Sequence, residues 1–216
     1  MRFRTPVIII LQMPRTAYFS KEAIVSKGLE LVREQGADAL SARSLSKALN
    51  CSISPLFTVF DNMEQIKTAV RKAASDMFAD YIADVSDYTP AFKEFGLRMV
   101  RFASHEYNLF RMLFLDGKPI GQAIPDKAKE CLEGIESAYG INEEQADVLF
   151  RQIWTFACGL AVIKGGQNSE SYNEDEISEM LSCQFSSMMY FLKSGRDIIN
   201  VQPRLRREGE NNTLDI

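Results

Sequence analysis

The sequence predicts an all-α protein of about nine helices, in which a small N-terminal unit of three helices precedes a larger helical bundle. Three observations predict this fold class. Apolar residues recur at helical spacing in most segments, capping patterns precede several of these segments, and no segment alternates as a β-strand does. The chain has 216 residues, 46% hydrophobic and 25% charged, which is the composition of a soluble globular protein.

Residues 1–16 do not follow the helical pattern. Arginines flank the apolar run at residues 7–11, and Pro6 and Pro14 prevent a helix there. One interpretation is an extended basic arm. Another is that translation starts at Met13 and that the preceding residues are not native. We favour the second, because five exposed apolar residues in a row promote aggregation.

The first predicted helix spans residues 20–35. Ser20 is in position to cap this helix, and Gly36 is in position to end it. One face of the helix is apolar, which predicts that it packs against the rest of the N-terminal unit. The residues of this face are Ile24, Gly28, Leu31 and Val32.

Residues 41–60 predict two short helices joined by a tight turn. Ser41 can cap the first helix, and Asn50 suits a left-handed residue at its end. Ser52 can cap the second helix, with Pro55 in the first turn, where a missing N–H is tolerated. Helix, turn and helix in this order form the helix-turn-helix unit, whose second helix enters the major groove of DNA. A plain αα-hairpin inside a helical bundle has the same pattern.

Six further helices are predicted from capping patterns, apolar periodicity and breaker residues. They span residues 62 to about 85, 90 to 105, 108 to 115, 126 to 139, 142 to 163 and 173 to about 195. The first of these is long enough to link the N-terminal unit to the bundle, so it is the candidate transmitter of any motion between them. Residues 196–216 are polar with little periodicity, which predicts a disordered tail.

Residues 19–70 resemble the TetR family of bacterial transcriptional regulators. The resemblance consists of a first helix ending in Gly36, then Ser-x-Arg-x-Leu-x-x-x-Leu from Ser41, then Ser-x-x-x-Leu-aromatic-x-x-Phe from Ser52, then a capped long helix. It implies a sequence-specific DNA-binding regulator, a repressor, that is released or modulated by an unknown small-molecule effector.

The resemblance also implies a domain organisation. Residues 17–62 would form the DNA-binding head, and residues 63–195 the ligand-binding and dimerisation body. The last two long helices would form a homodimer interface, so that two heads meet a palindromic operator on double-stranded DNA at a half-site spacing of about 34–36 Å. Both helices are apolar on more than one face, which is typical of helices buried on several sides.

Several family positions differ in this chain. The family usually has Gly at the turn, where this chain has Asn50, and a Tyr that reaches phosphate, where it has Phe57. Positions that are often basic or His are Thr58 and Val59. A phosphate-contacting Lys of the family is Met63 in this chain, and several phosphate donors are therefore missing.

Nine residues are candidate DNA contacts. Contacts to base edges or a thymine methyl group would come from the second helix of the motif: Ser52, Ile53, Ser54, Phe57 and Thr58. Contacts to phosphates would come from Ser41, Arg43, Lys47 and Lys67. The first 72 residues carry 11 Lys and Arg against 6 Asp and Glu, whereas the others carry 14 against 23. A basic head on an acidic body fits an approach to phosphates.

Aromatic and Met residues concentrate in the body, and two interpretations apply. For most of them the simpler one is a packed core. The other is an apolar pocket with a few polar groups, which by the resemblance would hold the effector. The candidate ligand contacts are Phe95, Met99, Phe102, His105, Tyr107, Phe110, Phe114, Gln152, Trp154 and Thr155.

No motif indicates catalysis, and we expect no enzyme activity, no cofactor and no metal site. The four cysteines lack C-x-x-C spacing and the chain has one His. Cys158 and Cys183 lie among apolar residues and are expected to be buried. No apolar run approaches the roughly 18 residues that span a bilayer, so no membrane partner is expected. Reduced thiols without an export signal indicate the cytoplasm.

Two other functions remain open. A helical small-molecule-binding or partner protein whose helix-turn-helix no longer binds DNA strongly would account for the missing phosphate donors. A helical enzyme would need a reactive carboxylate or thiol beside an unexpected ligand.

Overall fold

The computed structural model describes residues 19–83, 91–116, 139–166 and 171–194, and within these ranges it contains helices and no strand. The predicted all-α class is confirmed. The elements are α1 (Lys21–Gln35), η1 (Ala37–Ala39), α2 (Ala42–Ala48), η2 (Ser54–Thr58), α3 (Met63–Tyr81), α4 (Ala91–His105), α5 (Tyr107–Phe114), α8 (Glu143–Gly165) and α9 (Glu174–Lys193). The predicted N-terminal arm, the tail and all but the last residue of the helix predicted at 126–139 lie outside the described residues.

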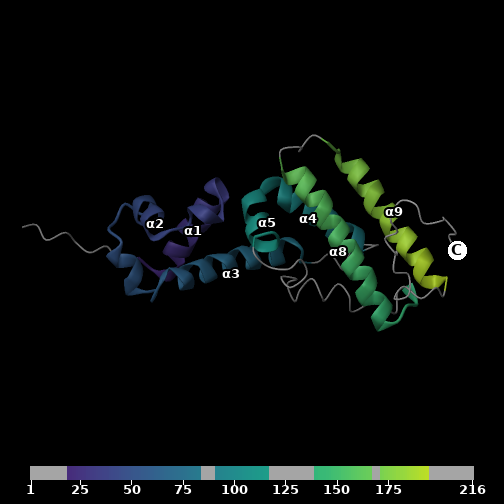
Figure 1. Ribbon diagram of the computed structural model, residues 1–216, viewed down its shortest axis with the longest axis horizontal. Helices are drawn as coiled ribbons and strands as arrows, with labels where there is room; N and C mark the ends of the chain where they lie inside the picture. The colour runs from purple at the N-terminus through teal and green to yellow at the C-terminus, as the bar shows by residue number, and fades with distance from the viewer. Residues whose placement is uncertain (1–18, 84–90, 117–138, 167–170, 195–216) are drawn as a thin grey trace, which may run out of the picture.

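The described elements form an elongated molecule with two parts. The head consists of α1, η1, α2 and η2, and the body of α4, α5, α8 and α9 (Figure 1). Helix α3 starts beside η2 in the head and runs to the body, so it connects the two parts as predicted. The chain between α2 and α3 lies at the end of the head farthest from the body.

Local capping bonds fix the helix starts in the head. Ser20 Oγ accepts a hydrogen bond from the Ala23 amide at 3.2 Å, and Gly36 ends α1 with a φ of 84°. Ser41 Oγ accepts from the Ser44 amide at 3.2 Å and so caps α2. The four residues predicted to form the inner face of α1 are buried, as expected from their spacing.

The second helix of the motif differs from the prediction. Residues 54–58 form a short 3₁₀ helix, in which the Leu56 amide donates to the Ile53 carbonyl at 3.1 Å. Its N-cap is Ile53 and it has no side-chain cap, so the prediction that Ser52 caps an α-helix is wrong. Pro55 lies in the first turn of this 3₁₀ helix, where an amide hydrogen would have no partner within the helix.

Helix α3 is also shorter than predicted. It ends at Tyr81 rather than near residue 85, and Tyr81 is 39% exposed. The Asn62 side chain caps it, accepting from the Gln65 amide at 3.0 Å. Gln65 Oε1 accepts from the Asp61 amide at 3.0 Å, one residue before the cap.

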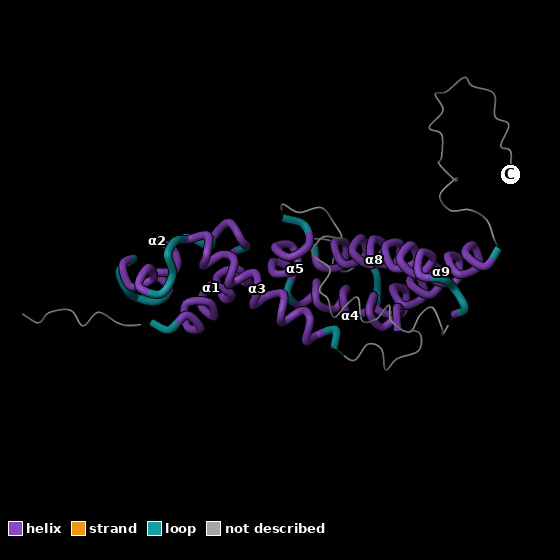
Figure 2. Tube along the Cα trace, turned by 90° about the horizontal axis from the view of Figure 1, so that it is seen from below, coloured by secondary structure: helices purple, strands orange, loops and turns teal. Residues whose placement is uncertain are grey.

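The body consists of two layers of helices. Helices α8 and α9 lie side by side and α4 packs beneath both, while α5 packs against α4 on the side of the head (Figure 2). Complete capping boxes start α8 at Asn142 and α9 at Asn173, as predicted. An aromatic cluster fills the space between the layers and reaches α3, where Phe78 makes edge contacts with Phe102 and Phe114.

Helix α8 is long enough and apolar enough to cross a membrane, with a mean hydropathy of 1.4 over an 18-residue window. No such span was expected from the sequence. Half of this window is buried inside the fold, where it packs on α4 and α9. Composition alone is weak support for a membrane span, since the core helix of a soluble protein passes the same test.

Candidate nucleic-acid interface

The outer tip of the head presents the residues that the sequence assigns to base contacts. Asn50 has a φ of 51°, the left-handed conformation expected at the turn. Pro55 and Leu56 are buried beneath the tip and anchor η2. Five neighbouring side chains are exposed there, namely Ser52, Ile53, Ser54, Phe57 and Thr58. Ile53 is 44% exposed and Phe57 38%, so two large apolar side chains face solvent at one place.

Two hydroxyl groups near the tip are already committed to the fold. Thr58 Oγ1 donates to the Pro55 carbonyl at 2.7 Å, so toward an incoming group it offers its methyl group and acceptor lone pairs. Ser41 Oγ accepts from the Ser44 amide and lies 3.0 Å from Ser44 Oγ. Ser44 Oγ also lies 2.6 Å from the Ala39 carbonyl, to which it donates. A phosphate contact by Ser41 would therefore use the same hydroxyl group that caps α2.

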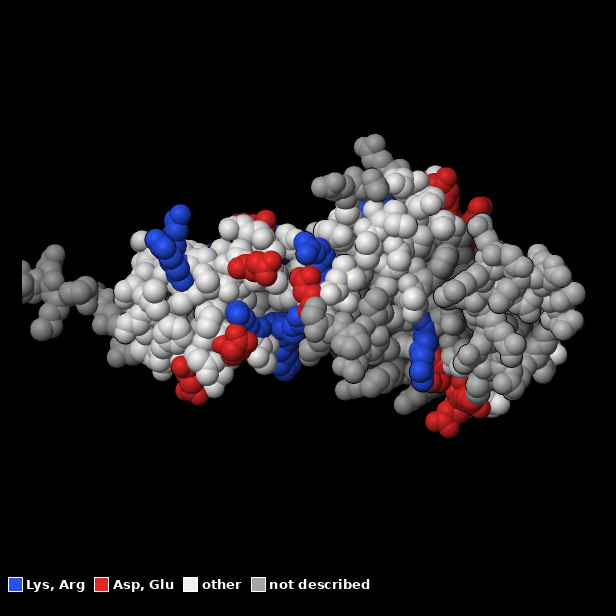
Figure 3. All heavy atoms as spheres, viewed as in Figure 1, with Lys and Arg blue, Asp and Glu red and all other residues white. Residues whose placement is uncertain are grey.

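The basic residues of this region differ in whether they form ion pairs. Arg43 and Lys47 on α2 are exposed and form no ion pair with any residue in the described ranges. Lys67 pairs with Glu64 at 2.8 Å, but both side chains are exposed, so the pair is worth little. In the view of Figure 3, charged side chains are sparse at the outer end of the head, and basic and acidic ones alternate near the body.

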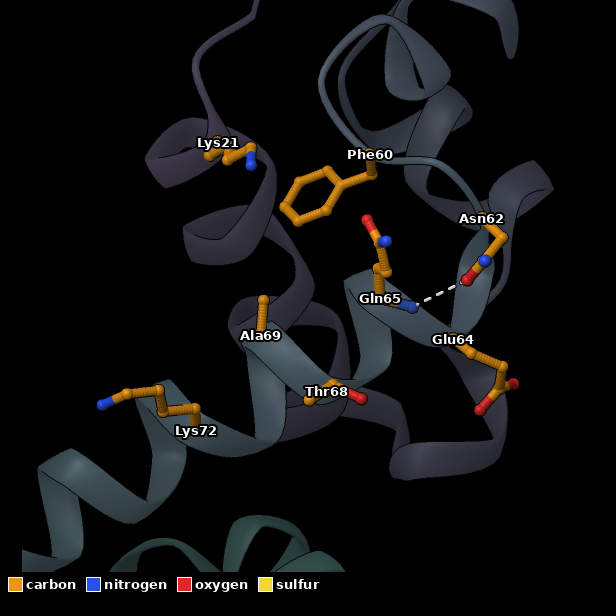
Figure 4. Close-up of a pocket in the computed structure, with 8 residues that line it drawn as sticks. All are labelled: Lys21, Phe60, Asn62, Glu64, Gln65, Thr68, Ala69 and Lys72. Carbon is orange, nitrogen blue, oxygen red and sulfur yellow. Dashed lines mark hydrogen bonds between the residues drawn. The ribbon is translucent and has the colours of Figure 1, made fainter.

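An open groove runs between the start of α1 and the first turns of α3. It has a volume of about 460 Å³, and its lining includes Lys21 on α1 and Lys72 on α3 (Figure 4). The Lys21 ammonium group lies 5.5 Å from the centre of the Phe60 ring, which forms part of the wall. None of the nine candidate DNA contacts lines this groove.

Hydrogen bonds tie the head to the body at α5. Arg33 Nε at the end of α1 donates to both carboxylate oxygens of Glu106, at 3.1 and 2.9 Å. Asn108 Nδ2 donates to the Arg33 carbonyl at 2.8 Å, and Arg71 on α3 reaches the Leu113 carbonyl at 3.4 Å. The sequence carried no signal for this junction, since Arg33 and Glu106 lie 73 residues apart.

The candidate ligand contacts fall into three groups in the structure. Six of them belong to the buried aromatic cluster, namely Phe95, Met99, Phe102, Phe110, Phe114 and Trp154. His105 and Tyr107 lie at the junction of α4 and α5, where His105 is exposed and Tyr107 half-buried. Gln152 and Thr155 are exposed on the outer side of α8, so the structure does not bring them to the aromatic cluster.

Trp154 has an unusual environment within the cluster. Its ring lies 5.5 Å from Phe95 and 5.5 Å from Phe114, measured between ring centres, and its side chain is 2% exposed. Its Nε1–H has no hydrogen-bond partner in the described part of the chain. A buried donor of this kind favours an acceptor at that place, because an unmet hydrogen bond costs about 1–3 kcal/mol.

Helices α8 and α9 share an exposed surface, which we call the outer face. On α8 it comprises Gln152, Thr155, Gly159, Val162 and Ile163, and on α9 Glu179, Cys183, Ser186, Ser187 and Tyr190. Tyr190 is 81% exposed, and a Cβ added at Gly159 would meet nothing within 4 Å. Such a surface, apolar or small at several positions on two long helices, can accept another pair of helices.

The cysteines differ in their surroundings. Cys158 is buried, as predicted, and burial raises the pKa of its thiol to about 12. Cys183 is exposed, so the prediction that it is buried is wrong, because it faces outward on α9. No group of three or more potential metal ligands occurs among the described residues.

Comparison with known proteins gives a fold but no sequence family. No protein-family model matches the chain. No curated protein matches it either. A solved structure of a TetR variant from Acinetobacter baumannii AYE in complex with minocycline is similar, with a TM-score of 0.60 and 16% sequence identity. The similarity covers 83% of this chain and 97% of that one, so the chain has a TetR-like fold.

Proposed function

We propose that this protein is a sequence-specific DNA-binding transcriptional regulator, a repressor, that works as a homodimer and responds to a small-molecule effector. The observation that carries the proposal is the exposed tip of the head, where five side chains between residues 52 and 58 face solvent around the buried Pro55 and Leu56. A TetR-like fold over 83% of the chain supports the same function, and supports a protein that is not an enzyme. The protein would act in the cytoplasm.

The tip would enter the major groove, with residues 17–62 as the DNA-binding domain. Ile53 and Phe57 offer apolar surface suited to a thymine methyl group, and Ser52 and Ser54 offer hydroxyl groups. The hydroxyl of Thr58 donates to Pro55, so Thr58 would accept from a base amino group or pack its methyl group on thymine. Arg43 and Lys47 would contact phosphates and set the register of the head.

The outer face would form the homodimer. A single short reading element contacts few base pairs, so two heads related by a twofold axis are the usual solution for specific binding. The apolar and small residues of α8 and α9 would pack against the same residues of a second copy. Gly159 would allow the two α8 helices to approach closely.

The body, residues 63–195, would bind the effector within the aromatic cluster. The buried Trp154 Nε1–H supports an effector that is mainly apolar and carries one hydrogen-bond acceptor. The effector would act on the heads through α3 and through the contacts of α5 with Arg33 and Arg71. It need only bind one arrangement of the heads better than the other. Re-addition of a co-purified compound, followed by the emission of Trp154, the one tryptophan of the chain, tests this part.

The proposed DNA binding is tested by a gel shift with the DNA upstream of the protein's own gene. We expect binding that weakens steeply as salt rises, because phosphate contacts release counterions. No shift at micromolar dimer and low salt would contradict the proposal.

One observation favours the second candidate, a helical small-molecule-binding or partner protein with a weak helix-turn-helix. Where the resembled family has two phosphate donors, this chain has Phe57 and Met63, whose side chains donate no hydrogen bond. A dimer that binds a co-purified ligand but shifts no DNA would support this candidate.

A further inference from the structure

A small cavity lies where the C-terminal half of α4 meets the end of α8 and the start of α9. It has a volume of about 170 Å³, which is below the usual range for drug-sized ligands. One wall is apolar and is formed by Leu97, Val100 and Ile177. Of the ten candidate ligand contacts, His105 lines this cavity, whereas the six residues of the buried aromatic cluster do not.

The opposite wall is polar and mostly basic. Arg101 and Lys164 bring positive charge and His105 an imidazole, and Glu174 carries the one carboxylate among the lining residues. The Lys164 ammonium group donates to the Tyr172 carbonyl at 2.7 Å. The His105 Nδ1 lies 2.7 Å from the Arg101 carbonyl. Because a carbonyl oxygen only accepts, Nδ1 carries the hydrogen, and Nε2 is the ring atom left to meet a ligand.

Among the residues that line the cavity, Glu174 is the anion that Arg101 binds. Arg101 Nε donates to Glu174 Oε1 at 2.7 Å, and its Nη2 donates to the same oxygen. The Glu174 side chain is 59% exposed and that of Arg101 39%, so the pair is solvated and is easily exchanged. A guanidinium group binds any carboxylate of suitable geometry in the same way.

We propose that this cavity binds a small organic carboxylate with a short apolar tail. The ligand carboxylate takes the place of Glu174 on Arg101, and the tail lies against Leu97, Val100 and Ile177. The small volume restricts the ligand to a few carbon atoms. The apolar wall favours such a ligand over inorganic phosphate, which has no apolar part.

The cavity is also connected to the linking helix. Arg101 Nη1 lies 3.7 Å from Glu94 Oε1, which holds Arg98 Nε at 2.8 Å. Arg98 Nη1 in turn donates to the carbonyl of Tyr81, the last residue of α3, at 3.2 Å. A ligand that changes the position of Arg101 therefore acts on the end of α3. An effect on DNA rests on the proposed function, whereas binding of the carboxylate does not.

Calorimetric titration of the full-length protein tests the site. The probes are acetate through hexanoate with their branched isomers, inorganic phosphate, and the alcohol that matches the best carboxylate. We expect saturable binding of one or more branched or medium-length carboxylates, and none of the matched alcohol or of phosphate.

Three variants report on the site. Arg101→Gln should weaken binding about 10- to 100-fold, the range of a hydrogen bond to a charged group. Glu174→Gln should tighten binding, because it removes the competing anion. Arg111→Gln changes the same charge on α5, outside the cavity, and should leave affinity unchanged. Circular dichroism shows whether each variant is folded. If Arg101→Gln does not fold, the affinity of Glu174→Gln still tests the proposal.

The proposal is overturned if no carboxylate of the series binds saturably to either the unmodified protein or the Glu174→Gln variant. It is also overturned if phosphate or the alcohol binds equally well, or if Glu174→Gln does not tighten binding. Carboxylate binding in a protein that shifts no DNA leaves this proposal standing and removes only the proposed function. A carboxylate that binds without altering an observed DNA affinity overturns the connection to α3.

Discussion

Gly159→Leu separates the fold of one chain from the proposed dimer. Gly159 lies within α8 on the outer face, and a Cβ at this position meets no atom within 4 Å. A leucine there has room in the single chain. Glycine inside a helix is about 0.8–1.0 kcal/mol less favourable than alanine, and leucine is close to alanine, so α8 should become more stable by roughly 0.5–1 kcal/mol.

The same substitution should weaken the dimer strongly. Overpacking a close contact costs about 1–3 kcal/mol, and a twofold interface receives one leucine from each copy. The expected loss is about 2–6 kcal/mol, or a dissociation constant raised from roughly 30-fold to more than 10,000-fold. Helicity and thermal stability of the chain should not fall.

Sedimentation velocity over a range of concentrations measures this change, with circular dichroism as the check on folding. Arg111→Leu is the control, because it adds a leucine to an exposed position of α5 that is not part of the outer face. It should sediment as the unmodified protein does. If Gly159→Leu remains as tightly dimeric as the unmodified chain, the outer face is not the interface and the reasoning fails.

Three other predictions concern the tip, the core and the thiols. Arg43→Ala should weaken DNA binding uniformly across sequences and reduce the slope of log affinity against log salt concentration by about 1, whereas Thr58→Ala should change sequence preference. Fluorescence anisotropy on a panel of duplexes measures both effects. If Thr58→Ala weakens binding equally on every duplex, Thr58 does not contact bases. Phe78→Ala should destabilise the protein by about 3–5 kcal/mol in urea unfolding, because Phe78 is fully buried where α3, α4 and α5 meet; a loss under about 1 kcal/mol would contradict that core. Burial raises the pKa of the Cys158 thiol to about 12. Iodoacetamide at mildly alkaline pH should therefore leave Cys158 unmodified in the folded protein and modify it in urea. Mass spectrometry of peptides measures this, and rapid modification of Cys158 in the folded chain would contradict its burial.

Helix starts could be predicted because a cap is a local interaction. Ser20, Ser41, Asn142 and Asn173 each accept from a backbone amide three residues ahead, and this spacing is visible in the sequence. The second helix of the motif is the exception. Ser52 has the right spacing for a cap, but the chain forms a 3₁₀ turn that starts after Ile53.

The outward side of a body helix could not be predicted in the same way. Helix α8 is apolar on more than one side, so its periodicity does not say which side packs on α4. Gln152 and Thr155 therefore appeared as candidates for an inner pocket, although they are exposed, and Cys183 on α9 appeared buried. The side that faces inward is set by tertiary contacts with helices far away in the sequence.

Sites built from distant segments left no local pattern at all. The pair Arg33 and Glu106 joins the head to the body across 73 residues, and Arg101 and Glu174 are separated by the same number. The sequence makes His105 a candidate ligand contact, but the structure places it at the cavity between α4, α8 and α9 rather than in the aromatic cluster. Only the folded chain brings these residues together.

Selection of DNA by the purified dimer from a pool of random-sequence duplexes at moderate salt tests directly whether the paired heads bind a specific sequence. The account predicts enrichment of a twofold-symmetric sequence with half-sites about one helical turn, or a multiple of it, apart. It further predicts that a dimer with Ile53→Ala and Phe57→Ala at the tip loses this enrichment while keeping its fold. A pool without any enriched sequence, or enrichment that survives both substitutions, would contradict it.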